Sequence, residues 1–320
     1  MRKTLTRILS SVMAAVVIST TCVGRQPVNA TTIADEGSGG AYAYDCETGE
    51  VKYLPDSSVY SHSDESEGST PAYSPDTDEE ELEDDLQTFA KANWDTVDDP
   101  ARIDTSRCTV HLKIKTQDGY CAGSGFLIRS NVVVTCGHAV YDKSYDPNNS
   151  YWANEIIVTP AANATGNTAP YGTAGVKVYI CSTGWINNAD ENYDWGVLIL
   201  DSDIGNLTGW HGLHYQSSSY NGTKATAKGY SNGRTQYVTK GTISSTSSKT
   251  FASKDMYVQH GMSGGPCYTK IDGYGYLVIG IIINYPSYDP NGIYHEKSVF
   301  RKIDKDLYDK LLQFCEEYAP

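Results

Sequence analysis

The chain has 320 residues and a formal net charge of −14. The acidity is local, because residues 31–92 carry 17 Asp and Glu against only Lys52 and Lys91, and residues 93–320 are close to neutral. A chain without a basic face is not expected to bind nucleic acid. Its length allows two domains, or one large domain with additional segments.

Residues 1–30 predict a secretory signal. A basic start that includes Arg7 is followed by a mostly apolar stretch at residues 8–18, which is too short to span a bilayer, and Val28-Asn29-Ala30 is a small-residue cleavage site. A lipid anchor at Cys22 is the alternative, but Ser19-Thr20-Thr21 lacks the usual aliphatic pattern before it. We therefore expect a secreted protein with no membrane contact once the signal is removed.

Residues 31–92 form an acidic segment that we call the leader. It is rich in Gly, Ser, Thr, Asp and Glu, and the run from Asp78 to Asp85 contains seven acidic residues and Leu82. Such a run cannot pack into a core, so we expect the leader to be disordered.

Eight cysteines are present, with Cys22 in the signal and Cys46 in the leader. The six that remain allow 15 disulfide pairings, and the sequence does not choose among them. No Cys-x-x-Cys pair occurs, and no histidine lies at ligand spacing from a pair of cysteines, so we expect no metal site.

From about residue 103, short apolar runs alternate with turn residues. Residues 109–116 alternate strictly, with Val110, Leu112 and Ile114 on one face, and Gln117-Asp118-Gly119 predicts a turn. Further strands are expected at residues 125–128, 132–134, 155–158, 176–180, 195–200, 223–230, 236–243 and 276–283. This spacing is typical of an all-β barrel or sandwich.

A helix is expected to end the chain, over residues 304–317. Asp304 can cap its N-terminus, and an apolar side follows at helical spacing. That side consists of Leu307, Leu311, Leu312 and Cys315.

Three short motifs carry candidate chemistry. Ser263 lies in Gly261-Met262-Ser263-Gly264-Gly265-Pro266, His138 follows an apolar run in Thr135-Cys136-Gly137-His138, and Asp194 precedes another in Asn192-Tyr193-Asp194-Trp195-Gly196. Taken singly, each is an ordinary turn or core residue more often than a catalytic one. Together, in the order His, Asp, Ser, they predict a catalytic triad.

Each residue type suits one role. A serine hydroxyl becomes nucleophilic when a base removes its proton, and His138 is the candidate base. Asp194 would orient the imidazole and stabilise its charged form. The amides of Gly261 and Ser263 would form an oxyanion hole, and Gly137 is expected to let the backbone turn sharply before His138.

These motifs resemble those of the chymotrypsin-like serine proteases, and within them the bacterial glutamyl endopeptidase family. The resemblance extends to Gly123–Ile128 and Val134–Asp142 around the histidine, and to Asp98–Ile103, which is similar to the start of mature enzymes of that family. It covers roughly residues 93–318.

The resemblance implies a definite architecture. We expect two antiparallel six-stranded β-barrels, about residues 103–205 and 206–303, with the triad in the cleft between them and the helix at 304–317 after them. It also implies a zymogen, in which the leader is a pro-segment that binds its own protease domain (residues 93–320) until cleavage near Lys91. A plain solvated linker is the alternative for the leader.

The chain departs from the family at several positions. Met262 stands where trypsin-type enzymes have the acid that completes activation, so that ion-pair switch is not expected. Val258 and Ile282 align with the polar residues that bind a glutamate side chain, which disfavours glutamate specificity. An uncharged residue is the expected preference, unless His260 or a freed N-terminal amine supplies the polarity.

Two further positions concern the substrate strand and the disulfide pattern. Ile283-Asn284-Tyr285 is expected to pair with an extended peptide substrate, and a plain core strand ending in a turn is the alternative. Ala139 follows His138 where relatives carry a cysteine, and Cys136 precedes it, so any disulfide would be differently placed.

We therefore expect a secreted, monomeric serine endopeptidase, made as a proenzyme, that acts on polypeptides without a metal or organic cofactor. An esterase of the α/β-hydrolase class is a weaker alternative, because its acid and histidine would follow the serine. His295 is the one histidine after Ser263, and too few residues remain there for the sheet and helices of that fold. The other alternative is an inactive binding module on a protease fold, although no triad member is missing.

Overall fold

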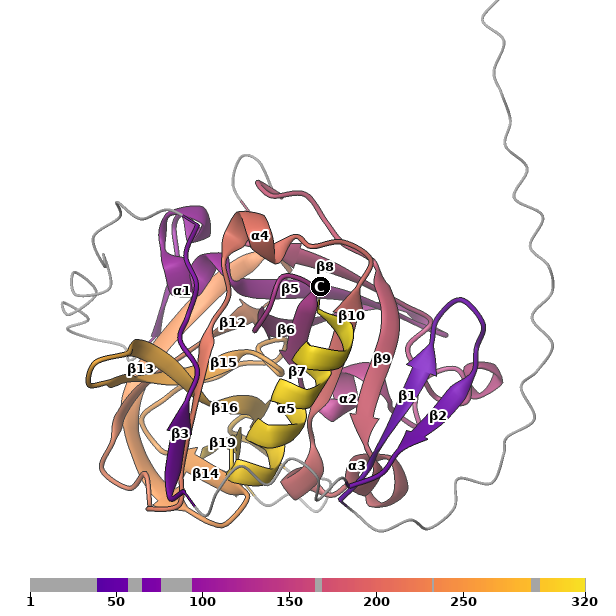
Figure 1. Cartoon of the computed structure of the whole chain (residues 1–320). Helices are drawn as coiled ribbons and strands as arrows, with labels where there is room; N and C mark the ends of the chain where they lie inside the picture. The colour runs from indigo at the N-terminus through magenta and orange to yellow at the C-terminus, as the bar shows by residue number, and fades with distance from the viewer. Residues whose placement is uncertain are drawn as a thin grey trace, which may run out of the picture.

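The computed structural model describes residues 39–56, 65–75, 94–164, 169–231, 233–288 and 294–319. The predicted signal, the acidic run at 78–85 and the expected maturation site near Lys91 lie outside these residues. Two β-sheets dominate the described chain, with short helices at their margins and one longer helix at the C-terminus (Figure 1). Within the described part, no helix is long and apolar enough to cross a bilayer.

The first sheet contains eight strands in the order β2-β1-β9-β10-β7-β6-β5-β8. Its six-stranded body is antiparallel and consists of β5 (Thr109–Thr116), β6 (Gly119–Leu127), β7 (Val132–Thr135), β8 (Glu155–Pro160), β9 (Val176–Ser182) and β10 (Gly196–Leu200). Val158 of β8 also bridges to Ala174, just before β9, so the two ends of this body meet.

Strand β5 shows how the sequence produces this sheet. Val110, Leu112 and Ile114 are buried on one face, while Lys113 and Lys115 point outward on the other. This is the two-residue period of a strand with one buried face. His111 breaks the pattern because it is buried on the outer face, where its ring meets the edge of Tyr230 of the second barrel.

The second sheet contains a closed barrel. Its strands β15-β12-β13-β14-β19-β16 follow one another, and β15 also pairs with β16, which closes the ring. The bounds are β12 (Lys224–Ser231), β13 (Thr235–Thr246), β14 (Thr250–Ser253), β15 (Pro266–Ile271), β16 (Gly275–Asn284) and β19 (Ser298–Lys302). The predicted fold, an all-β pair of antiparallel barrels followed by a helix, is confirmed.

Several strands were not predicted. Strand β11 (Gly212–Gln216) runs parallel to β16, and β4 (Trp94–Thr96) pairs with β13. Strands β14, β15 and β19 were also missed, because they are short and their apolar periodicity is weak. A separate ladder joins β17 (Ser287–Tyr288) to β18 (Tyr294–His295).

The remaining elements are mostly single helical turns: η3 (Pro100–Arg102), α1 (Asp104–Arg107), α2 (Gly137–Val140), η4 (Pro147–Asn149), α3 (Thr183–Asn188), η5 (Glu191–Tyr193) and α4 (Gly205–Thr208). The long helix is α5 (Lys305–Tyr318), and it packs against both β7 and β11, so it lies across the seam between the barrels (Figure 1). Its cap is as predicted, because Asp304 Oδ1 accepts the Leu307 N–H at 2.9 Å. Leu307, Leu311 and Cys315 are buried, while Leu312 is half-buried and Phe314 takes the remaining place on the apolar face.

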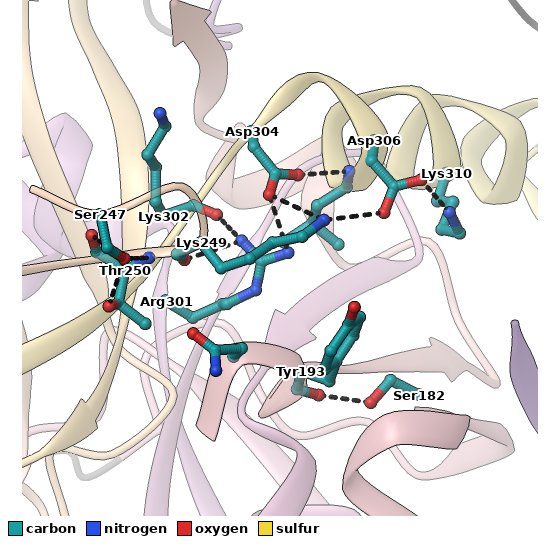
Figure 2. A network of polar contacts seen from close by, with 12 residues as sticks. Ser182, Tyr193, Ser247, Lys249, Thr250, Arg301, Lys302, Asp304, Asp306 and Lys310 are labelled. Atoms are coloured by element: carbon teal, nitrogen blue, oxygen red, sulfur yellow. Dashed lines mark hydrogen bonds and ion pairs between the residues drawn. The ribbon is translucent and has the colours of Figure 1, made fainter. Parts of the chain in front are cut away.

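A network of charges fixes the start of α5 (Figure 2). Asp304 Oδ2 lies 3.2 Å from Nη2 of the buried Arg301 and 3.2 Å from Nζ of Lys249. Burial lowers the pKa of Arg301, and the charges of Asp304 and Asp306 oppose that shift. One carboxylate therefore caps the helix and also compensates a buried guanidinium, which is costly to leave unpaired.

The leader differs from expectation wherever the structure describes it. Residues Ala41–Asp45 form β1, which pairs with β2 (Val51–Leu54) on one side and with β9 on the other. Residues Glu67–Ser69 form β3 on the edge of β11. The prediction of a disordered leader is therefore wrong for these parts. The alternating Ala and Tyr of β1 supply apolar side chains, and the exposed edge of β9 supplies backbone partners.

Candidate active site

His138 and Asp194 are brought together by two paired strands. His138 lies in α2, directly after β7, and Asp194 directly precedes β10 after the turn η5. The register of the two strands pairs Thr135 with Gly196, so the end of one strand lies beside the start of the other. Neighbouring strands in a sheet lie about 5 Å apart, so the two side chains meet just beyond the ladder.

The carboxylate holds the histidine at two points. Asp194 Oδ2 lies 2.8 Å from Nδ1 of the ring, and Oδ1 accepts the backbone N–H of His138 at 2.9 Å. Asp194 is only 2% exposed, while the His138 side chain is 29% exposed. One nitrogen of the ring is thus tied to a buried anion, and the ring itself remains accessible.

The electrostatics favour a charged imidazole. Burial opposes protonation of His138, but the charge of Asp194, together with Cys136, outweighs burial and holds the pKa of the histidine well above its ordinary value. An imidazolium formed during a reaction would be stabilised here.

At Gly137 there is no room for a side chain, whereas its backbone angle is one that any residue can adopt. It is not among the glycines with positive φ, contrary to the expected sharp turn. A Cβ at this position would lie 2.9 Å from Cγ of Trp185 and 3.1 Å from Oδ1 of Asp194. Any side chain would therefore separate the histidine from its carboxylate partner.

The serine motif forms a turn with two left-handed glycines, Gly261 at φ 93° and Gly264 at φ 86°. Ser263 between them is half-buried. A Cβ on Gly264 would lie 2.2 Å from Oγ1 of Thr135 and 3.1 Å from the amide nitrogen of Cys136. The turn of the second barrel therefore sits directly against the end of the strand that leads to His138.

Two amides of this turn are left unpaired. The N–H of Met262 donates to Gln259 O at 3.0 Å, and that of Gly264 donates to Ile282 O at 2.7 Å. In the part of the chain that the structure describes, the amides of Gly261 and Ser263 have no acceptor. These are the two amides that the sequence predicts for an oxyanion hole, and free donors are what such a site needs.

The second ring nitrogen of His138 faces a thiol. Its Nε2 lies 3.3 Å from Sγ of the buried Cys136. Among the described residues, the Ser263 hydroxyl makes no hydrogen bond. Catalytic hydrogen bonds are often long in free enzymes and shorten when substrate binds, so a hydroxyl without a hydrogen bond does not by itself exclude a catalytic role.

Ser124 of β6 is a functional candidate that sequence reasoning missed. Its N–H donates to Ser263 O at 2.8 Å, and its hydroxyl donates to Gly261 O at 2.9 Å. The same hydroxyl accepts the Tyr230 N–H at 2.7 Å, and Ser124 O accepts the Thr135 hydroxyl at 2.7 Å. Ser124 thus joins the serine turn to the histidine strand. No local sequence signal distinguishes it from other serines.

The predicted pocket positions separate into two groups. Val258 and Ile282 are 4% and 1% exposed and pack with Met262 in the core of the second barrel. His260 is exposed, and its ring lies edge-on to Tyr285 with 6.0 Å between centroids. The structure thus places Val258 and Ile282 in the core and His260 at the surface, while Tyr285 is half-buried against that core.

The proposed substrate edge follows the end of a ladder. The pairing of β15 with β16 ends at Pro266–Ile281, and Ile282 N–H then donates to Gly265 O at 2.9 Å. Ile283, Asn284 and Tyr285 continue past this point. The Asn284 amide donates to Glu191 Oε1 at 3.1 Å, which ties the edge to the turn before Asp194.

None of the cysteines that the structure describes is joined in a disulfide: Cys46, Cys108, Cys121, Cys136, Cys181, Cys267 and Cys315. Burial raises the pKa of Cys108 and of Cys315 to about 12, so both thiols are protonated at neutral pH. One group of three possible metal ligands occurs in the described residues, formed by Cys136, His138 and Asp194.

Comparison with known proteins shows which families this chain is similar to. A family model described as a trypsin-like peptidase domain matches residues 123–281. A glutamyl endopeptidase of Bacillus licheniformis is 31% identical over 217 residues, covering 64% of this chain and 62% of that protein. An extracellular metalloprotease of Bacillus subtilis is 35% identical over 147 residues, covering 43% of this chain and 44% of that protein. The chain thus spans about half to two-thirds of the curated relatives it matches.

Solved structures agree on the fold. A Glu endopeptidase in complex with MPD superposes with a TM-score of 0.57 at 18% identity, covering 71% of this chain and 98% of that one. The protease Anisep from Arthrobacter nicotinovorans gives a TM-score of 0.52 at 17% identity, covering 67% and 96%.

Proposed function

We propose that this chain is a chymotrypsin-like serine endopeptidase that uses Ser263, His138 and Asp194, and the similarity to trypsin-like peptidases and to a glutamyl endopeptidase supports this proposal. In this proposal Ser263 Oγ attacks the carbonyl carbon of a peptide bond while His138 Nε2 takes its proton. Asp194 keeps the other ring nitrogen protonated and stabilises the imidazolium. The amides of Gly261 and Ser263 receive the oxyanion.

The second half of the reaction reverses these roles. His138 gives its proton to the leaving amine, and the acyl group remains on Ser263. A water molecule, deprotonated by His138, then attacks the acyl-enzyme and releases the acid product. The proposal needs no group beyond these side chains and amides, and a single copy of the chain would suffice.

One observation carries the proposal. The Ser263 turn has two unpaired amides and lies against the strand that ends at His138, which is itself held by Asp194. A purely structural turn would have no reason to leave the amides of Gly261 and Ser263 without acceptors, because buried amides are nearly always paired.

A fluorophosphonate probe tests the proposal directly. The parent chain should become covalently labelled on Ser263, and His138→Ala should lose most of that labelling because the base is gone. Ser263→Ala should show neither labelling nor peptide cleavage while keeping its circular dichroism spectrum. Cleavage by the folded Ser263→Ala variant equal to that of the parent would refute the assignment and favour a different catalytic group.

We further propose that the enzyme prefers an uncharged residue at the cleavage site. The two positions that align with glutamate-binding residues, Val258 and Ile282, are apolar and buried, so they offer a carboxylate no hydrogen bond. Profiling a peptide library should give a kcat/KM for glutamate below that for uncharged residues. A clear preference for glutamate would overturn this part, and His260→Ala would then test whether the exposed imidazole supplies the missing polarity.

We also propose secretion as a proenzyme, supported by the signal pattern in residues 1–30 and the acidic leader. Because β1 and β3 pair with strands of the two barrels, the leader is expected to stay bound after a cut near Lys91. N-terminal sequencing and native mass measurement of the secreted protein test this. Recovery of active enzyme that lacks residues 39–75 would show that the leader dissociates.

A further inference from the structure

Cys136 gives the base a second partner, which the proposed reaction does not use. Its Sγ lies 3.3 Å from Nε2 of His138, the nitrogen that would take the serine proton. Ligand atoms of Cys136, His138 and Asp194 all lie within 4.8 Å of one another. A thiol, an imidazole and a carboxylate thus converge around the proposed base.

The hydrogen bonding of the ring is arranged as in metal-binding histidines. The Asp194 carboxylate can only accept, so the Nδ1 that faces it at 2.8 Å carries the proton. In the neutral ring the lone pair is then on Nε2, which lies 3.3 Å from Sγ. Metal-ligating histidines commonly donate their other N–H to a carboxylate, which fixes the tautomer and the ring orientation.

The distances suit a zinc-like cation. Zinc lies about 2.3 Å from a thiolate sulfur and about 2.0–2.1 Å from an imidazole nitrogen, which in tetrahedral geometry separates sulfur from nitrogen by about 3.6 Å. The present Sγ to Nε2 distance of 3.3 Å needs to widen by only a few tenths of an ångström. Hard cations such as Mg²⁺ and Ca²⁺ prefer oxygen ligands and do not suit this pair.

Access would be from the substrate side. Cys136 itself is buried, but the His138 side chain is 29% exposed and Ser263 is half-buried. A cation that approaches Nε2 from this side would reach Sγ and complete its coordination with water.

We propose that Cys136 and His138 form a binding site for a zinc-like divalent cation, with Asp194 as the outer partner of the histidine. On binding, the S–H bond of Cys136 breaks and, where the ring is charged, the Nε2–H bond of His138 breaks as well. The protons leave to water, and Sγ and Nε2 each donate an electron pair to the cation. Nε2 is then unable to take a proton from Ser263. The cation is therefore a reversible inhibitor, a consequence that rests on the proposed function, whereas binding itself does not.

Binding is measured first on the full-length Ser263→Ala variant, so that the result does not depend on activity. Titration with Zn²⁺ should show one site, and Co²⁺ should give a thiolate charge-transfer band. Adding Cys136→Ser or His138→Ala should weaken Zn²⁺ binding by at least about 10- to 100-fold, the range seen when support for a metal site is lost. Cys46→Ala, which removes a half-buried thiol of the leader, is the matched control and should bind as before.

Inhibition is measured next on the parent chain. Zn²⁺ should suppress peptide cleavage, EDTA should restore it, and Mg²⁺ at the same concentration should have no effect. Equal Zn²⁺ affinity in the parent and in folded Cys136→Ser and His138→Ala variants would refute the site. A cleaving enzyme that binds one Zn²⁺ without inhibition would refute the inhibitory role. A chain that binds Zn²⁺ through these residues but never cleaves peptides would refute the proposed function alone.

Discussion

At the scale of single residues, the contacts of His138 determine the position and the charge of its imidazole ring. Asp194 is buried and bonds to the ring and to the backbone of His138, so it sets both the position and the charge preference of the imidazole. In the proposed reaction His138 acts as a base only when it is neutral, so activity should fall as the pH drops through the pKa of His138.

Asp194→Asn should lower kcat by about 10⁴-fold, the loss typical for this position in a triad. It should also move the acidic limb of the kcat/KM profile to lower pH, because the charge that raises the pKa of His138 is removed. Asp190→Asn is the matched control, since Asp190 caps the adjacent turn through Asn192 N–H at 2.9 Å and does not contact the histidine. An acidic limb that stays in place in Asp194→Asn would contradict the electrostatic role.

Ser124→Ala should lower kcat more than it changes KM. The substitution removes the donor to Gly261 O and the acceptor for Tyr230 N–H, so the turn that carries the proposed oxyanion amides loses a hydrogen bond and a buried amide loses its partner. The free energy of unfolding should fall by about 1–3 kcal/mol. Ser130→Ala, which loses only a 3.4 Å contact to Asp203, should leave kcat unchanged. Steady-state kinetics and denaturant titration separate the two effects, and an unchanged kcat in Ser124→Ala would make the residue purely structural.

At the scale of elements, the leader hairpin is the main surprise. Strand β1 extends the first sheet from β9, and its residues Ala41 to Tyr44 are buried. Tyr44 stacks against Trp152 at 5.4 Å and Tyr179 at 6.0 Å, and its hydroxyl donates to Asn149 Oδ1 at 2.8 Å. The hairpin is therefore part of the core of the first barrel rather than a detachable tail.

Tyr44→Ala should destabilise the protein by about 3–5 kcal/mol, as expected for deleting a large buried aromatic side chain. Thermal unfolding of the full chain measures this loss. Lys52→Ala on the exposed part of β2 should change stability by less than about 0.5 kcal/mol. Equal melting temperatures for Tyr44→Ala and the parent would mean that the hairpin does not contribute to folding.

At the scale of the whole molecule, the two barrels meet through buried polar rings. His111 lies against Tyr230, and His211 lies between Phe126 and Tyr268. Burial is the main cause that lowers the pKa of His111 to about 4 and that of His211 to about 3. Both histidines are therefore neutral in the folded protein over most of the acidic range.

This neutrality predicts acid sensitivity. Below the ordinary histidine pKa of 6.5, the unfolded chain binds protons that the folded chain does not, so stability is lost as the pH falls from about 6.5 toward the folded-state values. At pH 4.5 each histidine should cost about 2–3 kcal/mol relative to pH 8. His211→Phe should reduce the loss between pH 8 and pH 4.5 by that amount. Denaturant titrations at the two pH values measure it, and an equal loss in parent and variant would contradict the argument.

The sequence by itself determined the features that repeat locally or depend on residue type. The alternation of Val110, Leu112 and Ile114 fixed β5, Asp304 fixed the start of α5, and the three motifs named the His138, Asp194 and Ser263 set. These features can be predicted from the sequence because each depends on residues within a few positions of one another.

Only the tertiary structure decided what depends on distant neighbours. The role of Ser124 and the place of β1 beside β9 both join segments that meet only after folding. Cys136 and His138 are two positions apart, but the ring of His138 is also bonded to Asp194, 56 positions away in the chain. Gly137 shows the same limit, because its reason for being glycine is the approach of Trp185 and Asp194 rather than its own backbone angle. Such contacts form where other elements leave space for a side chain, or where a strand edge leaves backbone N–H and C=O groups without a partner.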